Sequence, residues 1–183
     1  DWSSDVCSSD LLGIGQTYNS QVHHSATGSG TFEHLTAGPT TLLDPTGEGT
    51  VGSAVKDSAI VAAARAAGIP VETVPQLVAI AGDSNSKAQT EAKTILRERA
   101  VVLGEAVSSL VGLFNPTRVV LGGQAFTDYP DTLNLIASLI HQNSTDVDIR
   151  LTAARGRVQQ QAAAAVAITA VAYDPLHAVE GAR

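Results

Sequence analysis

The sequence predicts an α/β lobe with glycine-lined turns, and three observations indicate it. Apolar side chains recur at three- and four-residue steps from 92 to 114, the period of a long amphipathic helix. The apolar run 119–121 follows without alternation, which suits a strand buried on both faces. Asn115 and Pro116 separate the two elements, because proline lacks an N–H and disfavours α geometry in the residue before it.

The first eleven residues, DWSSDVCSSDL, resemble the translation of a common sequencing adapter and are excluded from the fold prediction. They are polar, rich in Ser and Asp, and without a usable period. They also contain the only tryptophan and the only cysteine, and the chain has no methionine. We therefore expect residues 12–176 to form one lobe of a longer, truncated protein, followed by a frayed tail at 177–183.

Composition excludes several classes of protein. Three of the 18 acidic residues lie in the adapter-like segment, which leaves 15 acidic against 11 basic residues. A mildly acidic chain binds nucleic acid poorly by itself. Without cysteine there is no disulfide framework and no thiolate metal site. No apolar run reaches the roughly 18 residues of a membrane span and no signal peptide is visible, so we expect a cytoplasmic protein.

The N-terminal part favours short strands and loops. A glycine-rich bend at 12–15 precedes loosely alternating residues at 16–24, which predicts a hairpin. The stretch 25–30, SATGSG, has the composition of a flexible loop, and 36–49 lacks any period and is expected to be a connector.

Helical signals dominate the remainder. Asp57 or Ser58 can cap a helix that ends at Gly68, and Thr73 can cap a second that ends at Gly82. The long helix is expected to begin at 83 or 84 and to end before Pro116. Beyond the opening strand, the pattern predicts a helix over 129–142, a strand with one solvated face over 147–152, and an alanine-rich helix over 158–173.

Two stretches carry the residues that could form a site. Glu33 and His34 are the one acid–imidazole pair beside a glycine-rich loop, although the pair can also be a solvated loop. Gly122 and Gly123 follow the buried strand, at the end where open α/β sheets bind ligands. The alternative there is an ordinary strand-to-helix turn.

Other possible nucleotide, metal and catalytic motifs lack the neighbouring residues that those functions require. Gly13 and Gly15 lack the lysine of a P-loop and precede a hairpin-like sequence rather than a helix. His23 and His24 have no further ligand at zinc spacing. No nucleophile elbow or triad order is present.

Three stretches together resemble the ROK family of bacterial repressors and sugar kinases. GIG at 13–15 is similar to that family's GTGIG turn, and GTFEHL at 30–35 is similar to its G-E-x-G-H motif. LGEAVSSLVGLFNPTRVVLGGQAF at 103–126 matches its helix–strand segment almost throughout. The resemblance implies the C-terminal lobe of an actin/hexokinase-like (ribonuclease H-like) α/β fold, with a mixed sheet and packed helices.

Departures from the family pattern point away from a kinase. Thr31 stands at the motif's glutamate position, His34 matches, and Glu33 is displaced. DPTGEGTV at 44–51 replaces the cysteines of the family's zinc cluster, so we expect no metal. Gln124 replaces a third glycine after VVLGG and is expected to crowd an adenine nucleotide.

The resemblance therefore implies the effector-sensing and dimerising lobe of a ROK-type, sugar-responsive transcriptional repressor. Glu33 and His34 are its expected effector-binding residues, and its nucleotide-like turns are Gly13, Gly15, Gly122, Gly123 and Gln124. We expect a sugar or sugar phosphate effector, a homodimer, DNA contact only through a missing upstream domain, and no catalytic residue, cofactor or membrane partner. The alternatives are the C-terminal lobe of an ATP-dependent sugar kinase and a pure oligomerisation module.

Overall fold

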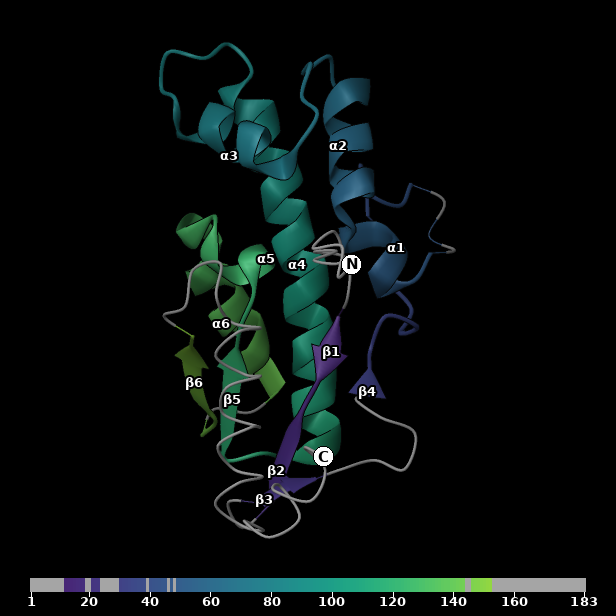
Figure 1. Ribbon diagram of the computed structural model, residues 1–183, viewed down its shortest axis with the longest axis vertical. Coiled ribbons are helices and arrows are strands. Elements are labelled where there is room, and N and C mark those ends of the chain that lie inside the picture. Colours follow the sequence, from purple (N-terminus) through teal and green to yellow (C-terminus); the bar gives the residue numbers. More distant parts are fainter. Residues whose placement is uncertain are drawn as a thin grey trace, which may run out of the picture.

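One long helix, α4 (Gln89–Phe114), runs through the middle of the molecule, and the other elements lie around it (Figure 1). The computed structural model describes residues 12–18, 21–23, 30–38, 40–45, 47, 49–143 and 146–152. The adapter-like segment 1–11, the predicted helix 158–173 and the predicted tail 177–183 lie outside these residues.

The ends of α4 show how local chemistry sets helix boundaries. The helix begins at Gln89, so the predicted start at 83 or 84 is wrong. Asp83 Oδ1 accepts the Asn85 N–H at 2.9 Å, and side chains of this kind favour turns over helix interiors. At the other end, Asn115 adopts the left-handed conformation with φ 43°, and the predicted stop before Pro116 is confirmed.

In the part of the chain that the structure describes, five further helical segments and one 3-10 turn lie around α4. The predicted helices at 57–68 and 73–82 are confirmed as α2 (Asp57–Ala66) and α3 (Val74–Gly82). The prediction at 129–142 corresponds to the 3-10 turn η1 (Pro130–Thr132) and α6 (Leu133–Asn143). The short helices α1 (Val51–Val55) and α5 (Gln124–Thr127) were not predicted. No helix among the described residues has the length and apolar character needed to cross a membrane.

The strands form three two-stranded pieces within the described residues. β1 (Gly13–Ile14) pairs antiparallel with β4 (Gly30–Thr31), and β2 (Gln16–Tyr18) with β3 (Gln21–His23). The second pair confirms the predicted hairpin. β5 (Arg118–Leu121) and β6 (Asp148–Leu151) confirm the strands predicted at 119–121 and 147–152, and the two pair in parallel. Val120 is 58% exposed, so the prediction that β5 is buried on both faces is wrong for the described residues.

Close packing of α4 against α6 builds much of the core. A Cβ placed on Gly104 would lie 2.7 Å from Leu139 Cδ1, so only glycine fits there without displacement. One turn along α4, the buried Ser108 hydroxyl donates to the Leu139 carbonyl at 2.9 Å and accepts from Asn143 Nδ2 at 2.9 Å. The largest fully buried side chains are Ile60, Ile69, Leu77, Ile95, Leu103, Ile136, Ile140, Val51 and Val71.

Candidate functional site

Glu33 and His34 lie in a tight turn directly after β4. The turn is closed by the Leu35 N–H, which donates to the Phe32 carbonyl at 3.1 Å. Because the segment is a turn and not a regular strand, the alternation that would separate neighbouring side chains does not apply. Glu33 is half-buried and His34 is exposed, so the imidazole is open to a ligand.

The Glu33 side chain connects the turn to Leu12, the residue before β1, through a hydrogen bond. Its Oε1 accepts the Leu12 N–H at 3.1 Å, and the Thr31 hydroxyl donates to the Leu12 carbonyl at 2.7 Å. Together with the pairing of Gly13 and Thr31 in β1–β4, these bonds bring the GIG stretch against the Glu33–His34 turn. Two of the predicted site stretches therefore meet in space.

The same turn rests on the beginning of α1. The Val51 N–H donates to the Leu35 carbonyl at 2.7 Å, and the Gly52 N–H donates to the Glu33 carbonyl at 2.9 Å. N–H groups in a helix's first turn have no partner within the helix, and here the turn's carbonyls supply it. A Cβ on Gly52 would approach Glu33 Cβ to 2.8 Å, so the contact requires glycine.

The segment 44–51, where the resemblance places a zinc cluster, is organised by a carboxylate. Asp44 is buried, its Oδ2 accepts the Gly49 N–H at 2.7 Å, and its carbonyl accepts the Gly47 N–H at 3.1 Å. The structure holds no group of three or more His, Cys, Asp or Glu arranged for a metal in the part of the chain it describes. Sequence reasoning missed Asp44, although an Asp followed by Pro and Gly is a turn signal.

The predicted site residues Gly122, Gly123 and Gln124 lie in a sharp turn after β5. Gly123 has φ 103°, which favours glycine, and its carbonyl accepts the Phe126 N–H at 3.1 Å and the Thr127 N–H at 3.2 Å. Gly122 is exposed in the turn, and Gln124 is the first residue of α5. The glycine pair thus serves a strand-to-helix turn, the alternative that the sequence left open.

A small cavity lies on the side of this turn that faces α3 and α4. Residues of α3, α4 and the segment from Gln124 to Thr132 surround a cavity of about 10 Å³, which holds about one water molecule. Tyr129 lines the cavity, and burial, helped by the neighbouring Asp131 carboxylate, raises the pKa of its phenol.

The predicted site residues fall into two groups. β4, which leads into the Glu33–His34 turn, and α5, which begins at Gln124, lie on opposite sides of α4 in Figure 1. Gly13 belongs to the first group. Gly15 is exposed, and a Cβ built on it meets nothing within 4 Å, so no packing requires glycine there.

An open hollow of about 620 Å³ lies beside α2 and includes none of the predicted site residues. Arg65 lines it, held by a bond from its Nε to the Val71 carbonyl at 2.9 Å. The remaining lining residues are Asp57, Ser58, Val61, Ala62, Glu72, Thr73 and Val74.

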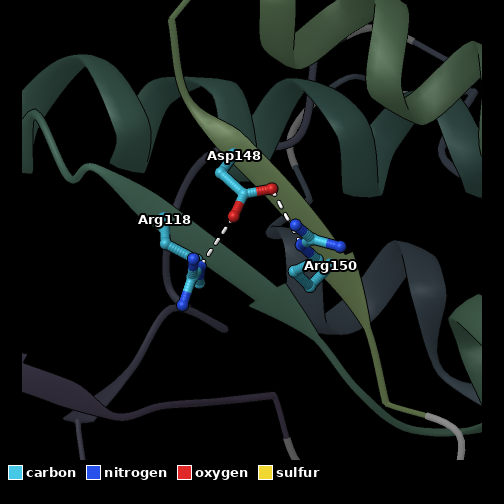
Figure 2. Close-up of polar contacts among 3 residues, drawn as sticks. All are labelled: Arg118, Asp148 and Arg150. Carbon is cyan, nitrogen blue, oxygen red and sulfur yellow. Dashed lines mark hydrogen bonds and ion pairs between the residues drawn. The ribbon is translucent and has the colours of Figure 1, made fainter.

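Arg118, Asp148 and Arg150 form a charged triad on the exposed face of the β5–β6 pair, and Figure 2 shows its geometry. Asp148 Oδ2 accepts from Arg118 Nε at 2.7 Å, and its Oδ1 accepts from Arg150 Nε at 2.9 Å. The hydrogen bond from Arg118 is the largest cause that holds the pKa of Asp148 below its ordinary value; Arg150 adds to it and burial opposes it. Sequence reasoning missed this triad because it depends on parallel register.

Comparison with known proteins identifies relatives among bacterial regulators. The chain is 35% identical over 188 residues to transcriptional regulators of Mycobacterium tuberculosis and Mycobacterium bovis, with 95% of this chain and 41% of each regulator covered. It therefore spans about two fifths of the length of these curated relatives. No protein-family model matches the chain.

Solved structures with the same fold include both branches of the ROK family. A ROK family transcriptional regulator, a homologue of the E. coli MLC protein, superposes with a TM-score of 0.62 at 22% identity, over 78% of this chain and 39% of that one. The ROK hexokinase of Thermus thermophilus gives 0.61 at 23% identity, over 81% and 52%. The resemblance predicted from sequence and the actin/hexokinase-like α/β fold are confirmed.

Proposed function

We propose that the chain is the effector-sensing part of a ROK-type transcriptional repressor that responds to a sugar or sugar phosphate. The observation that carries the proposal is the 35% identity to transcriptional regulators along 95% of the chain. The complete protein acts in the cytoplasm as a homodimer and contacts DNA through a domain outside this chain.

The Glu33–His34 turn is the proposed contact with the effector. Sugar hydroxyls are recognised by groups that accept and donate hydrogen bonds, which a carboxylate and an imidazole provide. His34 is exposed and offers its ring directly, whereas Glu33 Oε1 is engaged with Leu12, so His34 makes the principal contact. The effector acts by shifting the population of conformations toward the one that it binds better.

The ATP-dependent sugar kinase is the second candidate, because the hexokinase of Thermus thermophilus shares the fold. The 35% identity to transcriptional regulators along 95% of the chain favours the regulator. We therefore assign no catalytic residue to the chain.

A panel of sugars and sugar phosphates tests effector sensing. A ligand that binds the native state raises the unfolding temperature of the complete protein, and the stabilisation grows with the logarithm of the ligand concentration above the Kd. We expect stabilisation by one sugar class without ATP, and no ATP-dependent transfer of phosphate to that sugar. Stabilisation by no member of the panel supports the oligomerisation module instead, and phosphoryl transfer supports the kinase.

A further inference from the structure

We propose that Asp44 is a positioning residue for the Glu33–His34 turn, acting through Gly49 and the start of α1. The proposal deepens the proposed function, because it concerns the turn assigned to effector recognition. Asp44 itself lies ten positions beyond His34 in sequence and is given no contact with the effector.

The first step is the contact between Asp44 and Gly49. Asp44 is only 9% exposed as a residue, and a buried carboxylate is stable only when its oxygens are hydrogen-bonded. Oδ2 accepts the Gly49 N–H at 2.7 Å, within the range of a charge-assisted bond. A Cβ on Gly49 would lie 2.5 Å from that same oxygen, so the close approach depends on glycine.

The second step leads from Gly49 to the start of α1. The Gly49 carbonyl accepts the Ala37 N–H at 3.1 Å, and Thr36 and Thr50 form an antiparallel bridge. Thr50 then caps α1 through a capping box with Ser53, in which each side chain accepts the other residue's N–H, at 3.2 and 2.8 Å. The bond to Asp44 therefore fixes the residue before the cap.

The third step joins α1 to the turn. Val51 and Gly52, the first two residues of α1, donate to the Leu35 and Glu33 carbonyls on either side of His34. The two bonds measure 2.7 and 2.9 Å, and a side chain at Gly52 would disrupt them because its Cβ would lie 2.8 Å from Glu33 Cβ. A displacement at Gly49 is consequently passed to the backbone that carries the His34 imidazole.

Hydrogen exchange of the full chain, labelled with ¹⁵N-glycine and ¹³Cε1-histidine, tests the proposal without any effector. The Gly49 and Gly52 amides report the two ends of the connection, and the His34 ring signal reports the turn. Asp44→Ala removes the acceptor and Gly49→Ala displaces it, whereas Asp44→Asn keeps a carbonyl oxygen in place. The matched control is Asp83→Ala, which removes an exposed carboxylate that also accepts a backbone N–H, at 2.9 Å.

In Asp44→Ala we expect at least tenfold faster exchange at both Gly49 and Gly52 and a shifted His34 signal. Gly49→Ala should give the same change at Gly52 and His34. Asp44→Asn and Asp83→Ala should keep wild-type exchange at Gly52. Faster exchange at Gly49 alone, with Gly52 and His34 unchanged, would overturn the proposal.

The wild-type chain provides a measurement that does not depend on folding of the variants. At low denaturant concentrations, Gly49 and Gly52 should open together, with equal protection and equal dependence on denaturant. Unequal protection contradicts the coupling. In the complete protein, Asp44→Ala should also weaken sugar binding at least tenfold; if the wild type binds no sugar, the proposed function fails while the exchange data still decide the role of Asp44.

Discussion

Glu33 and His34, neighbours in one turn, have different physical roles. Glu33 joins β1 to the turn through the Leu12 N–H, whereas His34 is exposed beside it. We expect Glu33→Ala to lower the free energy of unfolding by about 1 kcal/mol, the usual worth of one hydrogen bond. His34→Ala should change it by less than about 0.5 kcal/mol, as for an exposed site.

Urea unfolding of the two variants measures this difference, and sugar-dependent stabilisation of the complete protein measures recognition. His34→Ala should lose the stabilisation by sugar while keeping the wild-type unfolding midpoint. Sugar binding that survives in His34→Ala would contradict the assignment of the imidazole as the effector contact.

Asp148 gives the exposed face of β5–β6 a defined pH dependence. Its folded-state pKa lies below the ordinary value of 3.8, so the stabilisation is present above pH 3.8 and is lost as the pH falls through the folded pKa. We expect the urea midpoint of the wild type to fall more than that of Asp148→Asn in this window. The difference should be small and should shrink in high salt, because the triad is exposed to solvent.

Two glycines within α4 should respond to alanine in opposite directions. Gly104→Ala puts a methyl group 2.7 Å from Leu139 Cδ1, 3.2 Å from Leu139 Cβ and 3.4 Å from Ile136 Cα, so Leu139 must shift. Such overpacking costs about 1–3 kcal/mol, more than the roughly 1 kcal/mol that alanine gains in a helix. Gly112→Ala meets nothing within 4 Å and should stabilise the chain by about 1 kcal/mol.

Chemical denaturation of both variants checks this prediction, with Gly112→Ala as the matched control on the same helix. Stabilisation by Gly104→Ala would show that α4 and α6 are not in close contact at this point.

Elements with local signals were predictable, whereas elements fixed by long-range contacts were not. The end of α4 follows from Asn115 and Pro116, and the hairpin of β2 and β3 from its composition. By contrast, α1 has only five residues, too few to show a helical period, and its start depends on carbonyls of Glu33 and Leu35. The predicted start of α4 failed because the polar residues before Gln89 form a hydrogen-bonded turn.

The candidate site was predictable in part for the same reason. Motif resemblance identified Glu33, His34 and the glycine turn after β5, but it could not show that Glu33 bonds to Leu12 or that Gln124 borders a cavity of about 10 Å³. Asp44 was missed because its partner, Gly49, is recognised only when the loop is folded.

At the scale of the whole molecule, the loop 40–50 is predicted to need no metal. Asp44 supplies the connection within the described part of this loop, and the sequence contains no cysteine beyond Cys7. Excess chelator should therefore leave the unfolding temperature unchanged, as measured by differential scanning fluorimetry with and without EDTA. A lowered unfolding temperature that added zinc restores would contradict this prediction.

The lobe packs small side chains around one central helix, and it shares that architecture with both a regulator and a hexokinase. Fold alone does not decide between regulation and catalysis, because one fold supports many functions. The proposal of a regulator rests on the relatives.

Binding of the complete protein to the DNA upstream of its own gene, measured by fluorescence anisotropy with increasing sugar, tests the central claim most directly. We predict binding in the absence of sugar and release by the same sugar that stabilises the protein, with no requirement for ATP. DNA affinity that no stabilising sugar alters, together with ATP-dependent phosphorylation of that sugar, would contradict the assignment as a sugar-responsive repressor.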